Sequence, residues 1–329
     1  MELTLDILWF AAGLVLVVKG ADWLTDGGSA VARHMNVSSL IIGLTIVAFG
    51  TSLPEFVVST ISATKGNSDM SMGNVVGSNI FNTMAVVGIT ALFCPVACRG
   101  ALFRRDIPVN ITASVLVACF LLCLGTDVIS RIEGTILLAI FCGYLAISIT
   151  QSVRSDRRRH DITSSADTLE PAVSVMPMWK AVTYIVVGLV ALVKGGDWFV
   201  DGASGIATRL GVSQSIIALT IVSIGTSLPE LATSIIAARK GDTDMAMGNV
   251  VGSNIFNLLL IIGTSAVITP IRPEGISMVD IAVMIAAVVT LGIMCTTNRR
   301  HNINKTKGAI LIVMATAYYT YLVVSSQAT

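Results

Sequence analysis

Long runs of apolar residues dominate the chain, and short polar segments separate them. Most runs approach or reach the roughly 20 residues that an α-helix needs to cross about 30 Å of hydrocarbon. Backbone N–H and C=O groups without hydrogen-bond partners are costly in lipid, so a membrane span must be a helix or part of a closed barrel. The runs show no period-two alternation of apolar and polar residues, so they predict helices rather than a barrel. We expect ten membrane spans, near residues 4–32, 38–63, 70–93, 107–124, 131–150, 180–207, 213–238, 245–268, 276–295 and 307–325.

An internal repeat organises these spans. Residues 19–95 align with residues 194–270 at a constant offset of 175 and without a gap. Each copy belongs to a unit of five spans, and because five is odd, the second unit enters the membrane from the opposite side. The pattern therefore predicts an all-α integral membrane protein built from two inverted-topology five-helix repeats. Two motifs occur in both copies: GTSLPE at 50–55 and 225–230, and GNVVGSNIFN at 73–82 and 248–257.

The repeat also predicts the domain boundaries. Residues 1–150 form the first five-helix repeat, with its motif region at 37–82, and residues 180–329 form the second, with its motif region at 212–257. The polar, basic segment 151–179 between them is short and is typical of a linker.

Composition and charge fix the class and the orientation. A chain with 54 % hydrophobic and 12 % charged residues has too little polar surface for a soluble globule of this length. Fifteen of the 21 Lys and Arg residues fall in segments on one side of the ten spans, and four fall on the other. By the positive-inside rule, both termini lie outside the inner (plasma) membrane and the 151–179 loop is cytoplasmic.

The cysteines, the Lys–Asp pairs within helices and the remaining sequence motifs do not indicate a catalytic or redox site. The six cysteines sit in or beside apolar helices without a CxxC pair or a His at ligand spacing, and we interpret them as small packing residues. Lys19 with Asp22, and Lys194 with Asp197, are i, i+3 pairs expected to neutralise each other. No nucleophile–His pair, P-loop or dinucleotide fingerprint occurs, so we expect neither an enzyme nor a nucleic-acid partner.

The motif GTSLPE interrupts an otherwise ordinary membrane helix. Pro54 cannot donate to the carbonyl of Gly50, so a break is expected there, with the carbonyls of residues 48–51 left free. Glu55 follows directly, and a carboxylate near the bilayer centre costs roughly 3 kcal/mol on insertion scales, which favours a functional role. The alternative is a structural kink with a hydrogen-bonded glutamate. Because Glu230 repeats the same context in the second half, we favour an ion site.

GNVVGSNIFN supplies a second wall. Asn74, Ser78 and Asn82 are spaced i, i+4, i+8 and form one polar stripe on an apolar helix, and the second copy repeats it. Carboxylates, amides, hydroxyls and carbonyls together make an all-oxygen donor set that suits Ca²⁺, Na⁺ or Mg²⁺ rather than Zn²⁺ or Cu⁺. Two glutamates would balance one Ca²⁺, and a flexible, largely dehydrated cage favours it over Mg²⁺.

These motifs resemble those of the cation/Ca²⁺ antiporter superfamily, and within it the prokaryotic Na⁺/Ca²⁺ exchangers. The resemblance covers essentially the whole chain and implies a ten-helix fold whose second, third, seventh and eighth spans bind Ca²⁺ and Na⁺ in competition. It implies a Ca²⁺ site made by Glu55, Glu230, Thr51, Thr226, Asn82 and Asn257. It implies Na⁺ sites lined by Ser52, Ser78, Ser227 and Ser253 with the carbonyls of Ala48 and Ser223.

The resemblance leaves the counter-ion open. The exchangers often carry Asp where this chain has Asn257, so coupling to K⁺ or H⁺ remains an alternative to Na⁺, and a passive cation channel is a second one. We expect secondary active exchange of Ca²⁺ for Na⁺ by alternating access, with the lipid bilayer and inorganic cations as the partners. Ca²⁺ and Na⁺ are the transported ions, no cofactor is expected, and the protein is expected to act as a monomer.

Overall fold

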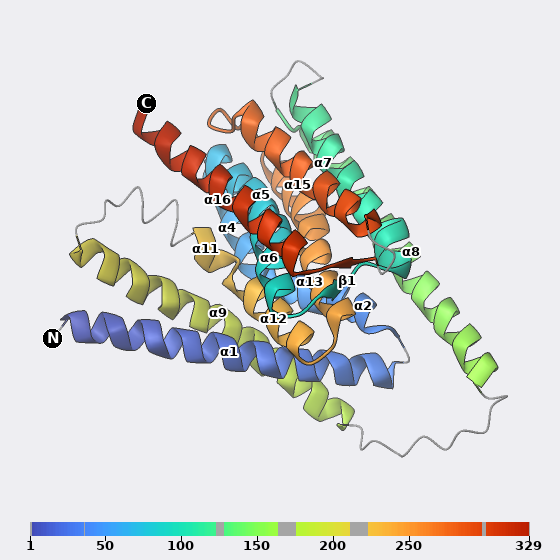
Figure 1. Cartoon of the computed structure of the whole chain (residues 1–329). Helices are drawn as coiled ribbons and strands as arrows, with labels where there is room; N and C mark the ends of the chain where they lie inside the picture. The colour runs from blue at the N-terminus through green and yellow to red at the C-terminus, as the bar shows by residue number, and fades with distance from the viewer. Residues whose placement is uncertain are drawn as a thin grey trace.

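A computed structural model describes residues 2–35, 37–122, 128–163, 176–210, 223–297 and 301–328. Within these residues the protein is helical, with two very short strands (Figure 1). Eight helices are long and apolar enough to cross a membrane, and a bent pair at residues 39–64 makes a ninth candidate. The seventh expected span, 213–238, lies partly outside the described residues. The all-helical membrane fold is therefore confirmed, and the number of spans stays a prediction.

The first half of the chain contains these elements: α1 (Glu2–His34), α2 (Ser39–Ile42), the π-helical segment η1 (Gly43–Val47), α3 (Ala48–Thr51), α4 (Leu53–Thr64), α5 (Ser68–Phe81), η2 (Asn82–Val86), α6 (Val87–Phe93), β1 (Val96–Ala97), η3 (Leu102–Asp106), α7 (Ile107–Leu122) and α8 (Arg131–Thr163). α8 continues beyond residue 150, so the expected linker begins as helix.

The second half contains α9 (Met178–Arg209), α11 (Ser223–Thr226), α12 (Leu228–Arg239), α13 (Thr243–Ile255), η5 (Phe256–Ile261), α14 (Ile262–Ile268), α15 (Met278–Thr296), β2 (Asn302–Ile303) and α16 (Lys305–Ala328). Both termini lie at the left of Figure 1.

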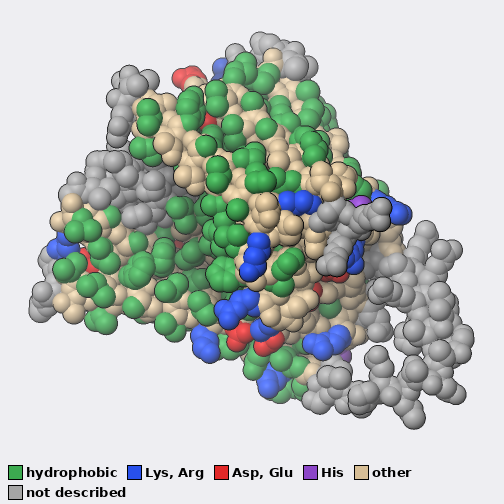
Figure 2. Space-filling view, in the orientation of Figure 1, with side chains coloured by type: hydrophobic (Ala, Val, Ile, Leu, Met, Phe, Trp, Pro, Cys, Tyr) green, Lys and Arg blue, Asp and Glu red, His purple; other side chains and the backbone are tan. Residues whose placement is uncertain are grey.

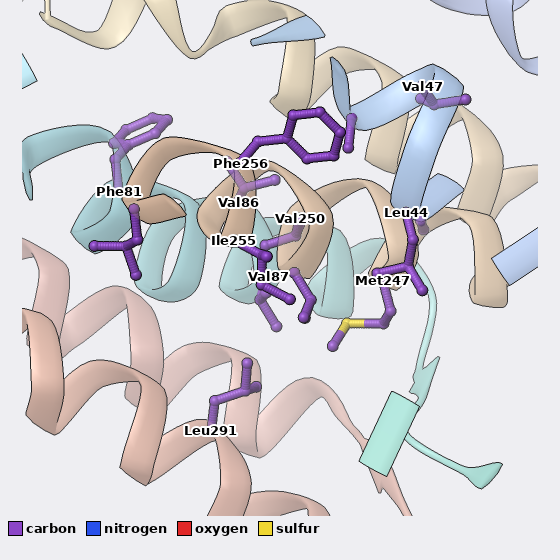
Figure 3. Close-up of a cluster of buried hydrophobic side chains, with 14 of the residues drawn as sticks. Leu44, Val47, Phe81, Val86, Val87, Met247, Val250, Ile255, Phe256 and Leu291 are labelled. Atoms are coloured by element: carbon purple, nitrogen blue, oxygen red, sulfur yellow. The ribbon is translucent and has the colours of Figure 1, made fainter. Parts of the chain in front are cut away.

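The helices α5–α6 and α13–α14 form the centre of the molecule. In the most apolar windows of these two spans, 83 % and 78 % of the residues are buried, against 17 % and 28 % for α1 and α9. Figure 3 shows Val86 and Val87 beside Val250 and Ile255 from the other half. Apolar side chains cover most of the displayed outer face, and Lys and Arg gather along its lower edge (Figure 2). This arrangement suits a helical bundle in lipid, where the outer surface stays apolar.

α1 and α9 form a separate antiparallel pair along one side of the molecule (Figure 1). A Cβ added to Gly13 would lie 2.7 Å from the Gly195 carbonyl, and one added to Gly20 would lie 2.8 Å from the Gly188 carbonyl. Glycines recur every seven residues on both helices, so the two backbones approach each other closely at these positions. The two helices are therefore packed together as one unit.

Short backbone pairings join the two halves at both ends. β1 pairs with β2 through Val96 and Ile303, and Ile129 forms an isolated bridge with Ile271. Beside β1, Cys98 and Cys295 form a disulfide. Our interpretation of all six cysteines as packing residues is therefore wrong for this pair. No local pattern indicates this pairing, because 197 positions separate the two cysteines.

Candidate cation site

Ser52 marks the break in the first motif. Its backbone has φ −85° and ψ 7°, and α3 and α4 on either side form part of the bent pair, whose two arms meet at 50°. The second motif repeats the break at Ser227, with φ −93° and ψ 7°. Pro54 and Pro229 then occupy the first turn of the new helix, where a missing N–H costs nothing. The expected break is thus confirmed in both copies.

The break places each glutamate in the first turn of a new helix, at Glu55 in α4 and Glu230 in α12. The positive end of a helix dipole favours a carboxylate at this position. Both side chains are fully buried. The two motifs therefore bring two acidic groups into the protein interior.

Each glutamate is bound by the serine of the opposite motif. The Ser52 hydroxyl donates to Glu230 Oε1 over 2.9 Å, and the Ser227 hydroxyl donates to Glu55 Oε1 over 3.2 Å. The GNVVGSNIFN helices add one hydroxyl each, because Ser78 lies 3.5 Å from Glu55 Oε1 and Ser253 lies 3.4 Å from Glu230 Oε1. The two repeats therefore form one site, not two.

Asn74 and Asn249 fasten each broken helix to its neighbour. Asn74 Nδ2 donates to the backbone carbonyl of Glu55 over 3.2 Å and to the Ser59 hydroxyl over 2.9 Å. Asn249 makes the same two bonds to Glu230 and Ser234, over 3.2 and 3.0 Å. Their amide groups are thus used to position the glutamates.

Asn82 and Asn257 lie on the central helices, inside the π-helical segments η2 and η5. Such segments widen a helix locally and are frequent at functional sites. Both side chains are fully buried. The buried oxygens left without a hydrogen-bond partner include Glu55 Oε2, Glu230 Oε2, Asn82 Oδ1 and Asn257 Oδ1.

Each of these oxygens is a buried acceptor without a hydrogen-bond donor. Burying such an acceptor costs free energy, and burying a charge without a counter-charge costs more. Within the described residues, no Lys or Arg forms an ion pair with Glu55 or Glu230. No group of three His, Cys, Asp or Glu side chains occurs there either. The donor set is therefore all oxygen, with two carboxylates, and a hard cation would satisfy it.

The other residues that were expected to bind the ions differ in their surroundings. The Ala48 carbonyl is not free as expected, because it accepts from the Ser52 N–H over 3.0 Å and lies 3.3 and 3.5 Å from the hydroxyls of Thr51 and Ser253. Thr51 also donates to Asn249 Oδ1 over 3.0 Å. Thr226 ends α11 and is half-buried, and Ser223 begins it, with a side chain outside the described residues.

A cavity of about 430 Å³ reaches this region from the surface. Its lining includes Met70, Asn74, Gly77, Thr226 and Gly275. At the opposite end, a Cβ added to Gly248 would meet the Leu40 carbonyl at 2.7 Å, so α2 and η1 cover α13 closely there. The structure is thus hollowed toward one end of the bundle and packed at the other.

Comparisons with known proteins agree with this geometry. The family model "Sodium/calcium exchanger protein" matches residues 5–150 and 180–326. The chain belongs to the sodium/calcium exchanger family. It is 38 % identical over 321 residues to the putative antiporter CaxA of Alkalimonas amylolytica, covering 97 % of this chain and 98 % of that one. It is 30 % identical over 353 aligned positions to the sodium/calcium exchanger MaX1 of Methanosarcina acetivorans, covering 97 % and 99 %.

Solved structures of the sodium-calcium exchanger NCX_Mj match with a TM-score of 0.80 at 30 % identity, covering 98 % of this chain and 99 % of that one. The family resemblance and the expected cation antiporter are therefore confirmed. This exchanger is a multi-pass membrane protein, like the similar inner membrane protein YrbG of Escherichia coli, which is 34 % identical over 286 residues and covers 86 % of each chain.

Sequence reasoning missed part of this exchanger's polar interior. Asn257 Nδ2 donates to Asn79 Oδ1 over 3.2 Å, and Asn254 Nδ2 donates to the Thr83 hydroxyl over 2.7 Å. Asn79 and Asn254 lie off the polar stripe, and both bonds cross between repeats. The available signal was that the motif repeats these asparagines too, which is unusual in an apolar helix.

The charged pairs in the first helix of each repeat differ from each other. Lys194 lies 3.4 Å from Asp197, as expected. Asp22, however, pairs with Lys240 over 2.5 Å rather than with Lys19.

Proposed function

We propose that this exchanger moves Ca²⁺ across the inner (plasma) membrane in exchange for Na⁺, by alternating access to one central site. The observation that carries the proposal is the crossed pairing of Ser52 with Glu230 and of Ser227 with Glu55. Because each glutamate depends on the other repeat, movement of one repeat against the other changes access to the site and its ligands together.

Ca²⁺ would bind to Glu55 and Glu230, whose second carboxylate oxygens have no protein donor. The amide oxygens of Asn82 and Asn257 and the hydroxyls of Thr51 and Thr226 complete its set. Two carboxylates balance the charge of one Ca²⁺, and oxygen ligands in a flexible cage suit its size.

Na⁺ would occupy flanking positions that share these oxygens. Ser52, Ser78, Ser227 and Ser253 would line them, together with the carbonyls of Ala48 and Ser223. Na⁺ on the Ala48 carbonyl requires the hydroxyl of Ser253 to turn away, and its 3.5 Å contact is long enough to give way. Shared ligands make the two ions compete, which couples their transport.

We further infer an inverted repeat of ten spans, 1–150 and 180–329, with both termini outside. The antiparallel α1–α9 pair supports this proposal, because the two helices are the first spans of their repeats. The bridges Val96–Ile303 and Ile129–Ile271 support it as well. Val96 and Ile271 correspond at the offset of 175, and Ile129 lies one position from the counterpart of Ile303.

The test is ⁴⁵Ca²⁺ flux into proteoliposomes under opposing Na⁺, K⁺ or H⁺ gradients. Uptake should follow the Na⁺ gradient and fall to background in Glu55→Gln and Glu230→Gln. Glu133→Gln is a matched control, because this buried glutamate accepts a backbone N–H outside the site, over 2.6 Å from Ser130. Uptake driven only by K⁺ or H⁺, or conductance above carrier rates, would reject Na⁺ exchange.

A further inference from the structure

Lys240 links the α1–α9 pair to the central helices. It lies at the C-terminal end of α12, and its Nζ is 2.5 Å from Asp22 Oδ1 and 2.8 Å from Asp26 Oδ1. Asp22 and Asp26 are four residues apart on α1, so both carboxylates face the same lysine. Close by, the Ser29 hydroxyl donates to Asp242 over 3.3 Å. α1 is thereby fastened to the end of α12 at several points.

The repeat carries the same residues at the opposite end of the bundle. At an offset of 175, Lys240 corresponds to Lys65, and Asp22 and Asp26 correspond to Asp197 and Asp201. Lys65 follows α4 as Lys240 follows α12, and both aspartates lie on α9. The components of a second fastening are therefore present.

In the structure the second set is not assembled. Lys65 is exposed and forms no ion pair with any residue that the structure describes. Asp197 instead pairs with Lys194 on its own helix over 3.4 Å. The Ser204 hydroxyl, which corresponds to that of Ser29, is buried without a described hydrogen-bond partner. One set of contacts is thus made and its counterpart is open.

The packing follows the same asymmetry. α1 lies along α12, whereas α9 does not lie along α4 in the described part of the chain. The cavity beside Met70 is at the end of the bundle that carries Lys65, and the close cover of α13 by η1 is at the end that carries Lys240. Because the glycine contacts hold α1 and α9 together, a shift of one of them relative to the central helices carries the other with it.

We propose that Lys240 with Asp22 and Asp26, and Lys65 with Asp197 and Asp201, are two mutually exclusive latches that hold the α1–α9 pair in the two access states. The Lys240 latch is closed in the conformation open toward the Lys65 end, and the Lys65 latch closes in the opposite conformation. These lysines are positioning residues, because they touch no transported ion. The inference rests on the proposed alternating access, which it supplies with a structural switch.

A partly exposed ion pair contributes little to overall stability. Its effect on a balanced two-state equilibrium is larger, because the loss of one latch shifts the ratio of the two states about fivefold. Lys194 competes with Lys65 for Asp197 in the present conformation. Its removal should therefore favour the Lys65 latch.

The experiment measures the access state directly, by hydrogen–deuterium exchange of residues 39–47 in ion-free purified protein. Lys240→Gln should increase exchange there, and Lys65→Gln should decrease it. Lys240→Arg should restore the wild-type pattern. Asp6→Asn is the matched control, because Asp6 pairs with Arg209 over 2.6 Å inside the α1–α9 unit and that pair moves with it.

The same variants are then assayed for transport from each side. Lys240→Gln should raise the half-saturating ion concentration about fivefold at the Lys65 end and lower it at the Lys240 end, and Lys65→Gln should do the reverse. Shifts in the same direction for both lysines, or exchange unchanged from wild type, would overturn the latch. Opposite exchange shifts in a protein that shows no Ca²⁺–Na⁺ exchange would leave the latch standing and reject the proposed function.

Discussion

The Ser52 hydroxyl donates to Glu230 Oε1 over 2.9 Å, across 178 positions of sequence. The Ser227 hydroxyl makes the equivalent bond to Glu55 Oε1 in the other direction between the repeats. The two acidic side chains are therefore oriented by the opposite repeat, which makes the site depend on how the halves sit together.

This crossed contact predicts the effect of removing one hydroxyl. Hydrogen bonds to charged groups contribute about 1.5–3 kcal/mol, so Ser52→Ala should weaken Ca²⁺ binding at least tenfold. Ser227→Ala should act similarly, because it orients the other carboxylate. Titration calorimetry of purified protein measures the change. Thr112→Ala, which removes an exposed hydroxyl bonded within α7, should bind as wild type does.

Asn257 offers a second test, through its unpartnered Oδ1. Asn257→Asp adds a third carboxylate to a site that holds two, and one Ca²⁺ no longer neutralises it. The variant should therefore take up a proton or a further cation during transport. Flux measured between about pH 5.5 and 8.5 should depend on pH more steeply than in wild type. An unchanged profile would place Asn257 outside the ion's reach.

The glycine contacts of α1 and α9 predict a packing effect. Gly20→Val places a side chain against the Gly188 carbonyl, 2.8 Å from the new Cβ. Overpacking of this kind typically costs about 1–3 kcal/mol. Thermal unfolding in detergent should therefore shift to lower temperature. Gly143→Ala on α8 is the control, because its added Cβ meets no described atom within 4 Å, and it should not lower the transition.

Lys240 predicts a pH limit for its ion pairs. Burial lowers the pKa of Lys240, but hydrogen bonds and charges from Asp22 and Asp26 together raise it above its ordinary value. Because the pKa of Lys240 is higher in the folded protein than in the unfolded chain, its ion pairs stabilise the fold fully at pH values below the ordinary lysine pKa of 10.5. This stabilisation is lost as the pH rises through the higher pKa of the folded protein. The difference in melting temperature between wild type and Lys240→Gln should thus stay constant up to about pH 10 and shrink above it.

Much of the fold could be predicted because the signals are local. Hydropathy predicted the eight long apolar helices and the bent pair at residues 39–64, and Pro54 predicted the helix break found at Ser52. The glutamates were identified because a membrane carboxylate is costly and this one occurs twice. All of these features can be read within one short segment of sequence.

Other features depend on contacts between distant segments. The Cys98–Cys295 disulfide, the Asn79–Asn257 bond and the Lys240–Asp22 pair each join positions that sequence spacing does not relate. The Ala48 carbonyl was expected to be free because Pro54 breaks the helix, but Ser52 N–H still reaches it. The relative placement of the two repeats determines the three long-range partners, whereas the bond to Ala48 is a helical bond that persists up to the break.

The most direct measurement of the central claim is equilibrium binding of ⁴⁵Ca²⁺ to purified protein at increasing Na⁺ concentration. One Ca²⁺ should bind per chain and be displaced competitively by Na⁺, and binding should be lost in both Glu55→Gln and Glu230→Gln. Ca²⁺ that remains bound in these variants, or that Na⁺ does not displace, would contradict a shared oxygen site between the two glutamates.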